Sequence, residues 1–388
     1  MNILMYRWKA YNQHDIIEQL EKRGHTVDTI RGEMANFEDD MVFGQKFADR
    51  LDGEHYDLVF TVNYFPIISD ICEARKIPYI SWCCDSPIST MYNQSVFNSV
   101  NRIFTFDKVD QMAFEDMGAR VYYLPLCPAT ERVDKMLETA GDLSKYDCDI
   151  SFIGSMYNKN SYDNIYDHMP EYMKGYFDGV LKMQMNVYGR YLLDDALDGE
   201  MLTEITRHFK LAKSERSFSD LSLIFSTTVL SYKIAQLERL SVISKIEARH
   251  EINVYTDDES VQFLRAKNCG LADYWEVSPK IFNRSRINLN LSLRSIRSGI
   301  PLRVWDILGA GGFCLTNYQP ELPLFFVNGR DLVWFNSTEE MLKKIDYYLA
   351  HEDERLKIAE NGYRLVREYH DYKNRLDTIA ETVPDIPL

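Results

Sequence analysis

The chain has 388 residues, of which 45% are hydrophobic and 27% are charged, and its formal net charge is −15. This length exceeds what one hydrophobic core usually supports, so two globular domains are expected. An acidic chain lacks the clustered lysines and arginines that phosphate contacts demand, which excludes a general nucleic-acid-binding protein.

No apolar run approaches the roughly 18 residues that cross a membrane, and the amino terminus lacks the apolar core of a secretory signal. We therefore expect a cytoplasmic protein without an integral membrane segment. The seven cysteines show no C-x-x-C spacing, so neither a zinc site nor a disulfide framework is predicted.

The first part of the chain, 1–128, alternates short apolar runs with helical runs, two of which end at Gly24 and Gly118. Parallel strands joined by such crossover helices form a doubly wound α/β domain. Its expected strands are 2–8, 26–30, 57–64, 78–84, 102–107 and 121–127, and its expected helices are 12–23, a polar run to about 51, 66–76, a short one after Pro87 and 109–117.

A polar stretch, 129–147, has no strand pattern and is expected to link two domains. The second domain, 148–370, begins with a strand near 149–155 and then contains an aromatic-rich helical insertion, about 157–248. A helical tail, 371–388, ends the chain. The sequence thus predicts an α/β protein with two Rossmann-like, doubly wound parallel-sheet domains. Later strands are expected at 252–257, 287–293, 313–317 and 332–335.

Ligands of doubly wound sheets gather at the carboxyl ends of the strands, so the residues that directly follow a strand are the first candidates for a site. The candidates are Tyr6, Arg7, Asn63, Tyr64, Asp85, Ser86 and Asp107 in the first domain, and Gly154, Ser155, Asp257, 292–299 and 317–321 in the second.

The helix expected after residue 300 begins in a way that favours an anion. Gly299 permits close approach of a ligand to the backbone, Pro301 suits the first helical turn, and the N–H groups exposed there attract negative charge. Arg294, Arg297 and Arg303 flank this turn, and bidentate hydrogen bonds from arginines would hold a diphosphate firmly.

Three segments, 81–87, 149–157 and 298–322, resemble the CgeB-like family of spore-maturation and glycosyltransferase proteins. The similarity covers most of the chain except the helical insertion. It implies the GT-B fold, in which two Rossmann-like domains face each other across a cleft. It also implies a nucleotide-sugar donor on the second domain, a glycan or protein acceptor on the first, and no metal or cofactor.

The resemblance assigns roles to single residues. Retaining transferases of this fold carry two acids eight positions apart, and Asp306 matches the second, which binds the nucleotide ribose. Ser298 stands at the first position, where a sugar-contacting carboxylate is therefore lost, and inversion or retention stays open. The expected donor contacts are Gly154, Ser155, Tyr274, Arg294, Ser298, Gly299, Asp306, Asn317 and Glu321, and the expected acceptor side comprises Tyr6, Arg7, Asn63, Tyr64 and Asp107.

Sugar transfer leaves negative charge on the departing diphosphate while the sugar becomes oxocarbenium-like, so cationic donors are needed on the phosphate side. Arg303 is the first candidate and Arg297 the second. An inverting enzyme also needs a general base for the acceptor hydroxyl, for which Asp85 is the candidate and Asp107 the reserve. Asp85 could instead cap the next helix.

Other conspicuous residues are interpreted as structural. Gly309–Gly312 are expected to end the helix and pack it tightly on its sheet. The acidic pairs that begin at Asp194 and Asp257 are interpreted as surface or turn residues, and the eight histidines show no spacing typical of metal ligands.

The leading hypothesis is a glycosyltransferase whose nucleobase, sugar and acceptor stay open. Two alternatives remain. A sugar-nucleotide epimerase of the same fold would use Asp85 and Asp107 on one substrate. A spore or cell-surface assembly protein would keep the fold without turnover, which the missing acid at Ser298 favours.

Overall fold

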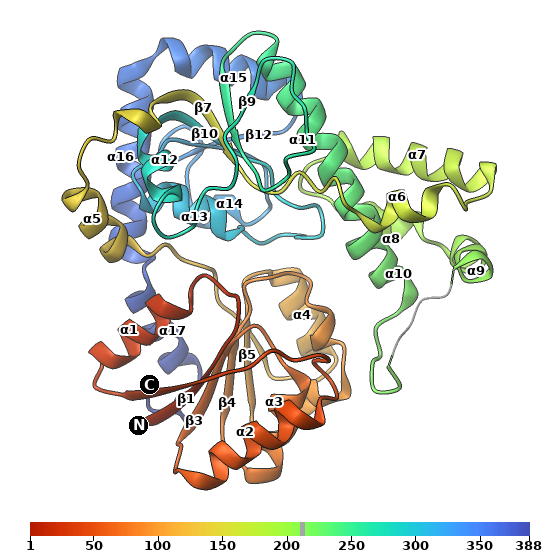
Figure 1. Cartoon of the computed structure of the whole chain (residues 1–388), viewed down its shortest axis with the longest axis vertical. Coiled ribbons are helices and arrows are strands. Elements are labelled where there is room, and N and C mark those ends of the chain that lie inside the picture. Colours follow the sequence, from red (N-terminus) through yellow and green to blue (C-terminus); the bar gives the residue numbers. More distant parts are fainter. Residues whose placement is uncertain (210–213) are drawn as a thin grey trace. The chain divides into compact units, whose positions relative to one another are not determined.

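The computed structural model describes residues 1–209 and 214–388 (Figure 1). Contacts within the chain divide it into two compact units. Unit 1 contains residues 1–127, 214–219 and 370–388, and unit 2 contains residues 128–209 and 220–369. Each unit is built around one six-stranded sheet. Among the described residues, no helix is both long and apolar enough to cross a membrane.

The sheet of unit 1 is wholly parallel and has the strand order β2-β1-β3-β4-β5-β6. Its central strands are nearly continuous apolar runs, as expected for strands covered on both faces. The strands are β1 (Asn2–Arg7), β2 (Thr26–Arg31), β3 (Leu58–Val62), β4 (Tyr79–Trp82), β5 (Asn101–Thr105) and β6 (Val121–Tyr123).

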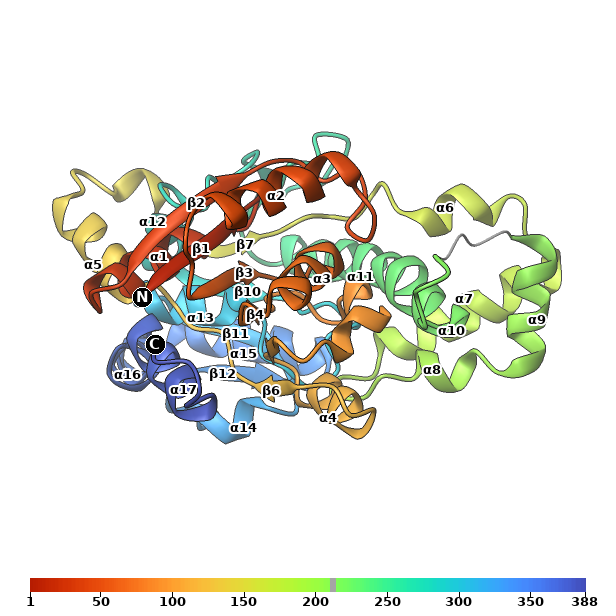
Figure 2. The ribbon, with the colours of Figure 1, turned by 90° about the horizontal axis from the view of Figure 1, so that it is seen from below.

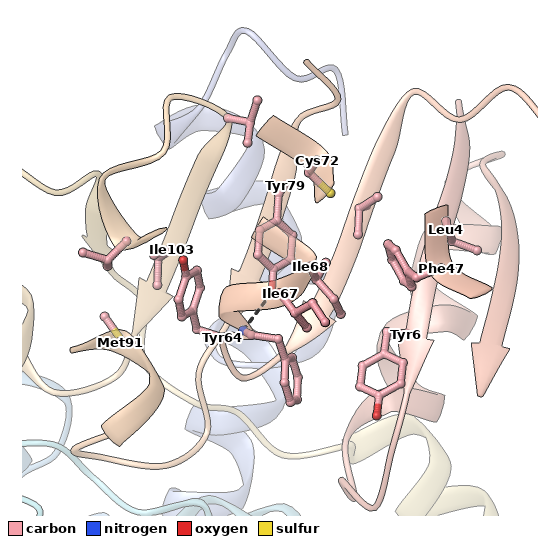
Figure 3. Packing of buried hydrophobic residues seen from close by; sticks show 14 of the residues in the cluster. Leu4, Tyr6, Phe47, Tyr64, Ile67, Ile68, Cys72, Tyr79, Met91 and Ile103 are labelled. Carbon is pink, nitrogen blue, oxygen red and sulfur yellow. Dashed lines mark hydrogen bonds between the residues drawn. The ribbon is translucent and has the colours of Figure 1, made fainter. Parts of the chain in front are cut away.

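Side chains that alternate along these strands fill two cores. Leu4 and Tyr6 pack with the apolar side chains of α2 (Met41–Gly53) and α3 (Pro66–Arg75) on one face (Figure 3). On the other face, Trp82 meets Tyr372 of α17 (Tyr372–Thr382), with ring centroids 5.8 Å apart. The remaining helices of unit 1 are α1 (Gln13–Lys22), which contacts α17, α4 (Lys108–Asp116), η1 (Ser89–Met91) and η2 (Gln94–Phe97).

Unit 1 also includes residues 214–219, which lie between helices of the insertion in the sequence. Ser217 forms an antiparallel bridge with Asn93, and Phe218 stacks on Phe97 with ring centroids 5.8 Å apart. Arg216 forms a two-point ion pair with Asp70, at 2.6 and 3.2 Å. The insertion therefore supplies a short segment to the first unit.

The sheet of unit 2 is also parallel, with the order β12-β11-β10-β7-β8-β9. Helices α11 and α15 contribute to the core on one face, and α12 and α13 contact β10 outside that core. The elements are β7 (Cys148–Ile153), β8 (Ile252–Tyr255), β9 (Lys267–Asn268), β10 (Ser285–Asn290), β11 (Cys314–Asn317), β12 (Val333–Phe335), α11 (Ser231–Glu247), α12 (Ser278–Arg284), α13 (Leu302–Gly309), α14 (Leu322–Phe325), α15 (Thr338–Ala350) and α16 (Glu352–Tyr369).

The predicted helical insertion forms a layer with its own core, in which Phe177, Phe225 and Leu230 are buried together. Figures 1 and 2 show its helices projecting from the sheet of unit 2. Helix α11 joins the two cores, because Ile234 belongs to the core of the insertion and Ile243 to that of the sheet. The insertion contains α6 (Ser161–Tyr166), α7 (Glu171–Met185), α8 (Leu193–Ala196), α9 (Gly199–His208), α10 (Leu221–Ile224) and η4 (Phe225–Leu230).

The predicted fold class, two doubly wound parallel sheets, is confirmed. The stretch 129–147, predicted as a linker, instead contains α5 (Thr130–Thr139) and η3 (Ser144–Tyr146) and is grouped with unit 2. The predicted tail, 371–388, forms α17 and the end of unit 1, since its apolar side chains cover a face of the sheet.

The structural interpretation of Gly309–Gly312 is also confirmed. A Cβ atom on Gly309 would lie 2.4 Å from Cβ of Pro128, and one on Gly312 would lie 2.5 Å from the carbonyl oxygen of Phe282. Both positions therefore exclude any side chain.

Candidate functional site

The loops at the carboxyl end of the second sheet are tied to one another. The Ser298 hydroxyl donates to the carboxylate of Glu321 at 2.6 Å, and the Glu321 N–H donates to the carbonyl of Ser298 at 3.1 Å. The Ser292 N–H donates to Oδ1 of Asn317 at 2.7 Å. Ser298, Asn317 and Glu321 are all buried, so these predicted donor contacts form the frame of the loops.

A buried arginine of α11 donates hydrogen bonds to two of these loops. The guanidinium of Arg239 donates to the carbonyl of Ser155, after β7, and to that of Leu291 at 2.9 Å, after β10. It stacks on Phe152 and Tyr157, and its Nε has no hydrogen-bond partner among the described residues. Burial lowers the pKa of Arg239, and the charge of Arg303 lowers it further.

The first turn of α13 has no side-chain cap for its backbone N–H groups. Pro301 stands at the N-cap position and offers no side-chain cap, and the N–H of Val304 donates to the carbonyl of Pro301 at 3.0 Å, so an anion would be bound by the N–H groups that precede Val304. Arg303, in the first turn, lies over the ring of Phe282 at 5.1 Å. One of its terminal nitrogens is buried and has no hydrogen-bond partner in the described chain. Arg239 and Arg303 thus bring two cations together at this edge of the sheet.

Arg294 and Arg297, predicted to share the diphosphate, are occupied by acidic partners instead. Arg294 pairs with Glu238 at 2.6 Å, and both side chains are about 95% buried. Arg297 pairs with Asp194 at 2.7 Å. Asp194 is exposed, as its interpretation as a surface residue predicts, and it is also the ion-pair partner of Arg297. Burial raises the pKa of Asp194, and Arg297 opposes that shift.

Asp306 and Tyr274, the predicted ribose and base contacts, lie together. The Tyr274 hydroxyl donates to Oδ1 of Asp306 at 3.0 Å. Both residues line a small pocket with Pro128, Arg132 and Phe282. Since Arg303 and Asp306 are three positions apart in α13, their side chains project from the same side of the helix. Gly154, the other predicted contact here, donates its N–H to the carbonyl of Tyr255 at 3.0 Å, and Gly299 is buried.

Asp85 places an exposed carboxylate at the carboxyl end of the sheet of unit 1. Asp85 follows β4, and its Oδ2 accepts from the side-chain amide of Asn63 at 2.7 Å. The next helix, η1, has Ile88 at its N-cap and no side-chain cap, so Asp85 does not cap it. The carboxylate is therefore held by Asn63 and faces solvent.

Three other predictions for the acceptor side are corrected. Tyr6 is buried and donates its hydroxyl to Gly32 at 2.7 Å, and burial raises its pKa to about 12 (Figure 3). Tyr64 is buried and its hydroxyl is bonded to Ser95. Asp107 is buried and caps α4 by accepting from the N–H of Val109 at 3.0 Å. These three side chains serve the core and a helix terminus.

Arg7 ends β1, at the same sheet edge as Asn63. It is half-buried, and its pKa is lowered first by burial and then by the charge of Arg31. Its predicted role as an acceptor contact stays a prediction.

Two site residues, Glu238 and Arg239, were absent from the sequence prediction. They stand in α11, which carries other charged and polar residues such as Lys233 and Glu247, so no sequence signal separated them from surface residues. Among the described residues, no group of three or more His, Cys, Asp or Glu side chains is arranged to hold a metal ion.

Residues 254–381 match the family model described as glycosyl transferase-like. A search of curated protein sequences finds no match. Among solved structures, the chain is similar to sucrose-phosphate synthase (tll1590) from Thermosynechococcus elongatus, with a TM-score of 0.58 and 8% identity over 99% of this chain and 98% of that chain. It is also similar to trehalose-6-phosphate synthase OtsA, with a TM-score of 0.58 and 11% identity over 100% and 99% of the two chains.

A further similar structure is that of Anabaena Alr3699/HepE in complex with UDP and glucose, with a TM-score of 0.55 and 10% identity over 99% of both chains. These similarities extend over the full length of the chain. With its two six-stranded parallel sheets and a glycosyl transferase-like region at residues 254–381, the chain has the fold of the GT-B glycosyltransferases.

Proposed function

We propose that the chain is a glycosyltransferase of the CgeB-like kind that moves a sugar from a nucleotide-sugar donor to a hydroxyl of a glycan or protein. Unit 2 would bind the donor and unit 1 the acceptor. The proposal depends above all on Arg239 and Arg303, whose charges repel each other and each of which has one buried nitrogen without a hydrogen-bond partner among the described residues.

A bound anion would relieve the repulsion between these two cations. Burying a charged group without a partner is costly, and neighbouring like charges add to that cost. A diphosphate at the open start of α13 would accept hydrogen bonds from Arg303 and from the helix N–H groups. Arg239 would stabilise the same anion and keep the loops after β7 and β10 in place.

The neighbouring groups fit the rest of a sugar nucleotide. Asp306 would accept hydrogen bonds from the ribose hydroxyls, and Tyr274 lies beside it where a base would stack. The Ser298–Glu321 pair would place a carboxylate near the sugar, although the sequence motif lacks an acid at position 298.

The UDP nucleotide is the first to test, because several chains of similar fold were solved with UDP or UDP-glucose. In the transfer, the bond between the anomeric carbon and the diphosphate oxygen breaks while a bond to the acceptor oxygen forms. The acceptor proton passes to Asp85, and the electron pair leaves with the diphosphate, whose charge Arg303 stabilises. We expect no metal requirement.

The test is a thermal-shift and nucleotide-release screen with UDP-, GDP-, ADP-, CMP- and dTDP-sugars, and with the free nucleotides as controls. One nucleotide should stabilise the protein, and its sugar should be released slowly without any acceptor. Chelation of divalent cations should leave this release unchanged.

Variants then test the residues. Arg303→Ala should lose nucleotide binding and release while it still unfolds cooperatively. The control Arg364→Ala, an exposed residue of α16, should behave as wild type. Wild-type release in Arg303→Ala would contradict the diphosphate assignment. Nucleotide binding without release in the wild type would favour a non-catalytic assembly protein.

A further inference from the structure

The backbone of Asn63 adopts a left-handed conformation. Asn63 follows β3 and has φ = 64°, in the left-handed region that glycine adopts freely and that asparagine adopts more readily than most other residues when its side chain forms local hydrogen bonds. Strained residues of this kind cluster at ligand and active sites. An asparagine at this position therefore indicates a role for its side chain that glycine could not fill.

The surrounding structure fixes the backbone of Asn63 on both sides. Its N–H donates to the carbonyl of Trp82 at 3.0 Å, and its carbonyl accepts from the hydroxyl of Thr61 at 2.6 Å. One residue earlier, the carbonyl of Val62 accepts from the indole of Trp8 at 2.8 Å. The end of β3 is thus bonded both to β4 and to the segment after β1.

The side chain of Asn63 is buried and bonded at both of its polar atoms. Oδ1 accepts from the N–H of Cys84 at 2.8 Å, and Nδ2 donates to Oδ2 of Asp85 at 2.7 Å. Because the N–H of Cys84 can only donate, the amide oxygen must face it. The amide nitrogen must then face the carboxylate.

We propose that Asn63 is a positioning residue for Asp85. It occupies one carboxylate oxygen, Oδ2, and so fixes the plane of the carboxylate and leaves Oδ1 to accept the proton of an acceptor hydroxyl. This inference rests on the proposed function, in which Asp85 is the general base. A fixed base needs no reorientation at the moment of proton transfer, and misplacement by about 1 Å can cost on the order of 100-fold in rate.

The decisive variant is Asn63→Gly. Glycine keeps the left-handed backbone but removes both hydrogen bonds of the amide and adds freedom to the unfolded chain, so the melting temperature should fall somewhat while unfolding stays cooperative. Hydrolysis of UDP-glucose should fall at least tenfold in kcat, with KM unchanged, because the donor contacts lie in unit 2. A purely structural role for Asn63 would leave kcat at the wild-type value.

Two further variants serve as comparisons for Asn63→Gly. Asn63→Asp keeps the shape of the side chain but replaces the donated N–H by a second carboxylate, and its kcat should fall as far. Lys76→Gly relieves the same left-handed strain at the exposed C-cap of α3, and it should leave kcat unchanged. If Asn63→Gly retains wild-type kcat, as Lys76→Gly should, Asn63 has no positioning role.

Asp85→Asn, measured beside them, separates this inference from the proposed function. If it stops hydrolysis while Asn63→Gly does not, only the positioning role is overturned. If Asp85→Asn keeps wild-type kcat, Asp85 is not the base and the inference fails, although donor binding can stand. If the wild type neither binds nor hydrolyses any sugar nucleotide, both the function and the inference fail.

Discussion

The guanidinium of Arg294 lies 2.6 Å from the carboxylate of Glu238 and 3.9 Å from the ring centre of Tyr188. The Tyr188 hydroxyl also donates to Glu238, at 2.8 Å. This buried cluster joins α11, the insertion and the loop between β10 and α13. Arg294 therefore stabilises the loop that precedes α13, and Arg303 is the arginine of that loop and helix that we propose as the phosphate ligand.

Removal of Arg294 should destabilise unit 2 strongly. Arg294→Ala leaves Glu238 as a buried carboxylate without its cation, a change that typically costs about 3–5 kcal/mol in the free energy of unfolding. Arg297→Ala is the matched control, because Asp194 is 42% exposed and such a pair is typically worth about 1 kcal/mol or less. Urea unfolding should separate the two variants, and equal losses would contradict this stabilising role of Arg294.

The glycines that end α13 should tolerate no side chain. In Gly312→Ala, the new methyl group would collide with the backbone of Phe282, and the backbone must shift to accommodate it. We expect a loss of about 1–3 kcal/mol in the free energy of unfolding. Gly175→Ala, in α7, has no atom within 4 Å of the added methyl group and should stabilise the protein by about 0.5–1 kcal/mol.

The sheets were predictable because their strands carry strong local signals. Both are parallel, and short apolar runs separated by helices of crossover length indicate that arrangement. The start of α13 at Pro301 was predictable from local sequence too, since glycine, proline and arginine stand within a few positions of one another, and anion binding there stays a prediction. Tyr6 could also have been placed correctly, because it alternates with Leu4 and thus shares its buried face.

The partners of the arginines were not predictable from local patterns. Arg294 and Arg297 bind acids that the insertion and α11 supply, and sequence spacing carries no information on such distant pairing. Asp107 and Asp85 both follow strands in the same way, yet one caps a helix and the other faces solvent beside Asn63. Only the three-dimensional arrangement separates these two roles.

The last helix should be essential to unit 1. Leu376 is fully buried on the inner side of α17, and Leu376→Ala should cost about 2–5 kcal/mol in the free energy of unfolding. Leu356→Ala, on the exposed side of α16, should cost little because that side chain is 55% exposed. Hydrogen exchange on peptides of unit 1 should become faster in Leu376→Ala, whereas peptides of unit 2 should keep their wild-type rates. Faster exchange in unit 2 alone would contradict the assignment of α17.

His370 should make the stability of unit 1 depend on pH. Burial, with help from the charge of Arg375, lowers its pKa from 6.5 to about 4, and the neutral ring faces the Arg375 guanidinium at 3.3 Å. Above pH 6.5 the ring is neutral in both the folded and the unfolded chain, so the folded state loses nothing. As the pH falls from 6.5 toward 4, the unfolded chain takes up a proton that the folded chain excludes, and the free energy of unfolding falls.

The size of this effect follows from the shift in pKa. Each pKa unit corresponds to about 1.4 kcal/mol, so the loss between pH 6.5 and 4 should approach about 3 kcal/mol. His370→Asn keeps a hydrogen-bond acceptor for Arg375 but cannot titrate, and it should lack this component of the pH dependence. The measurement is urea unfolding at pH 7.5, 6 and 5, followed by hydrogen exchange on peptides of unit 1. A constant difference between wild type and variant across this range would show that His370 titrates alike in the folded and unfolded chains.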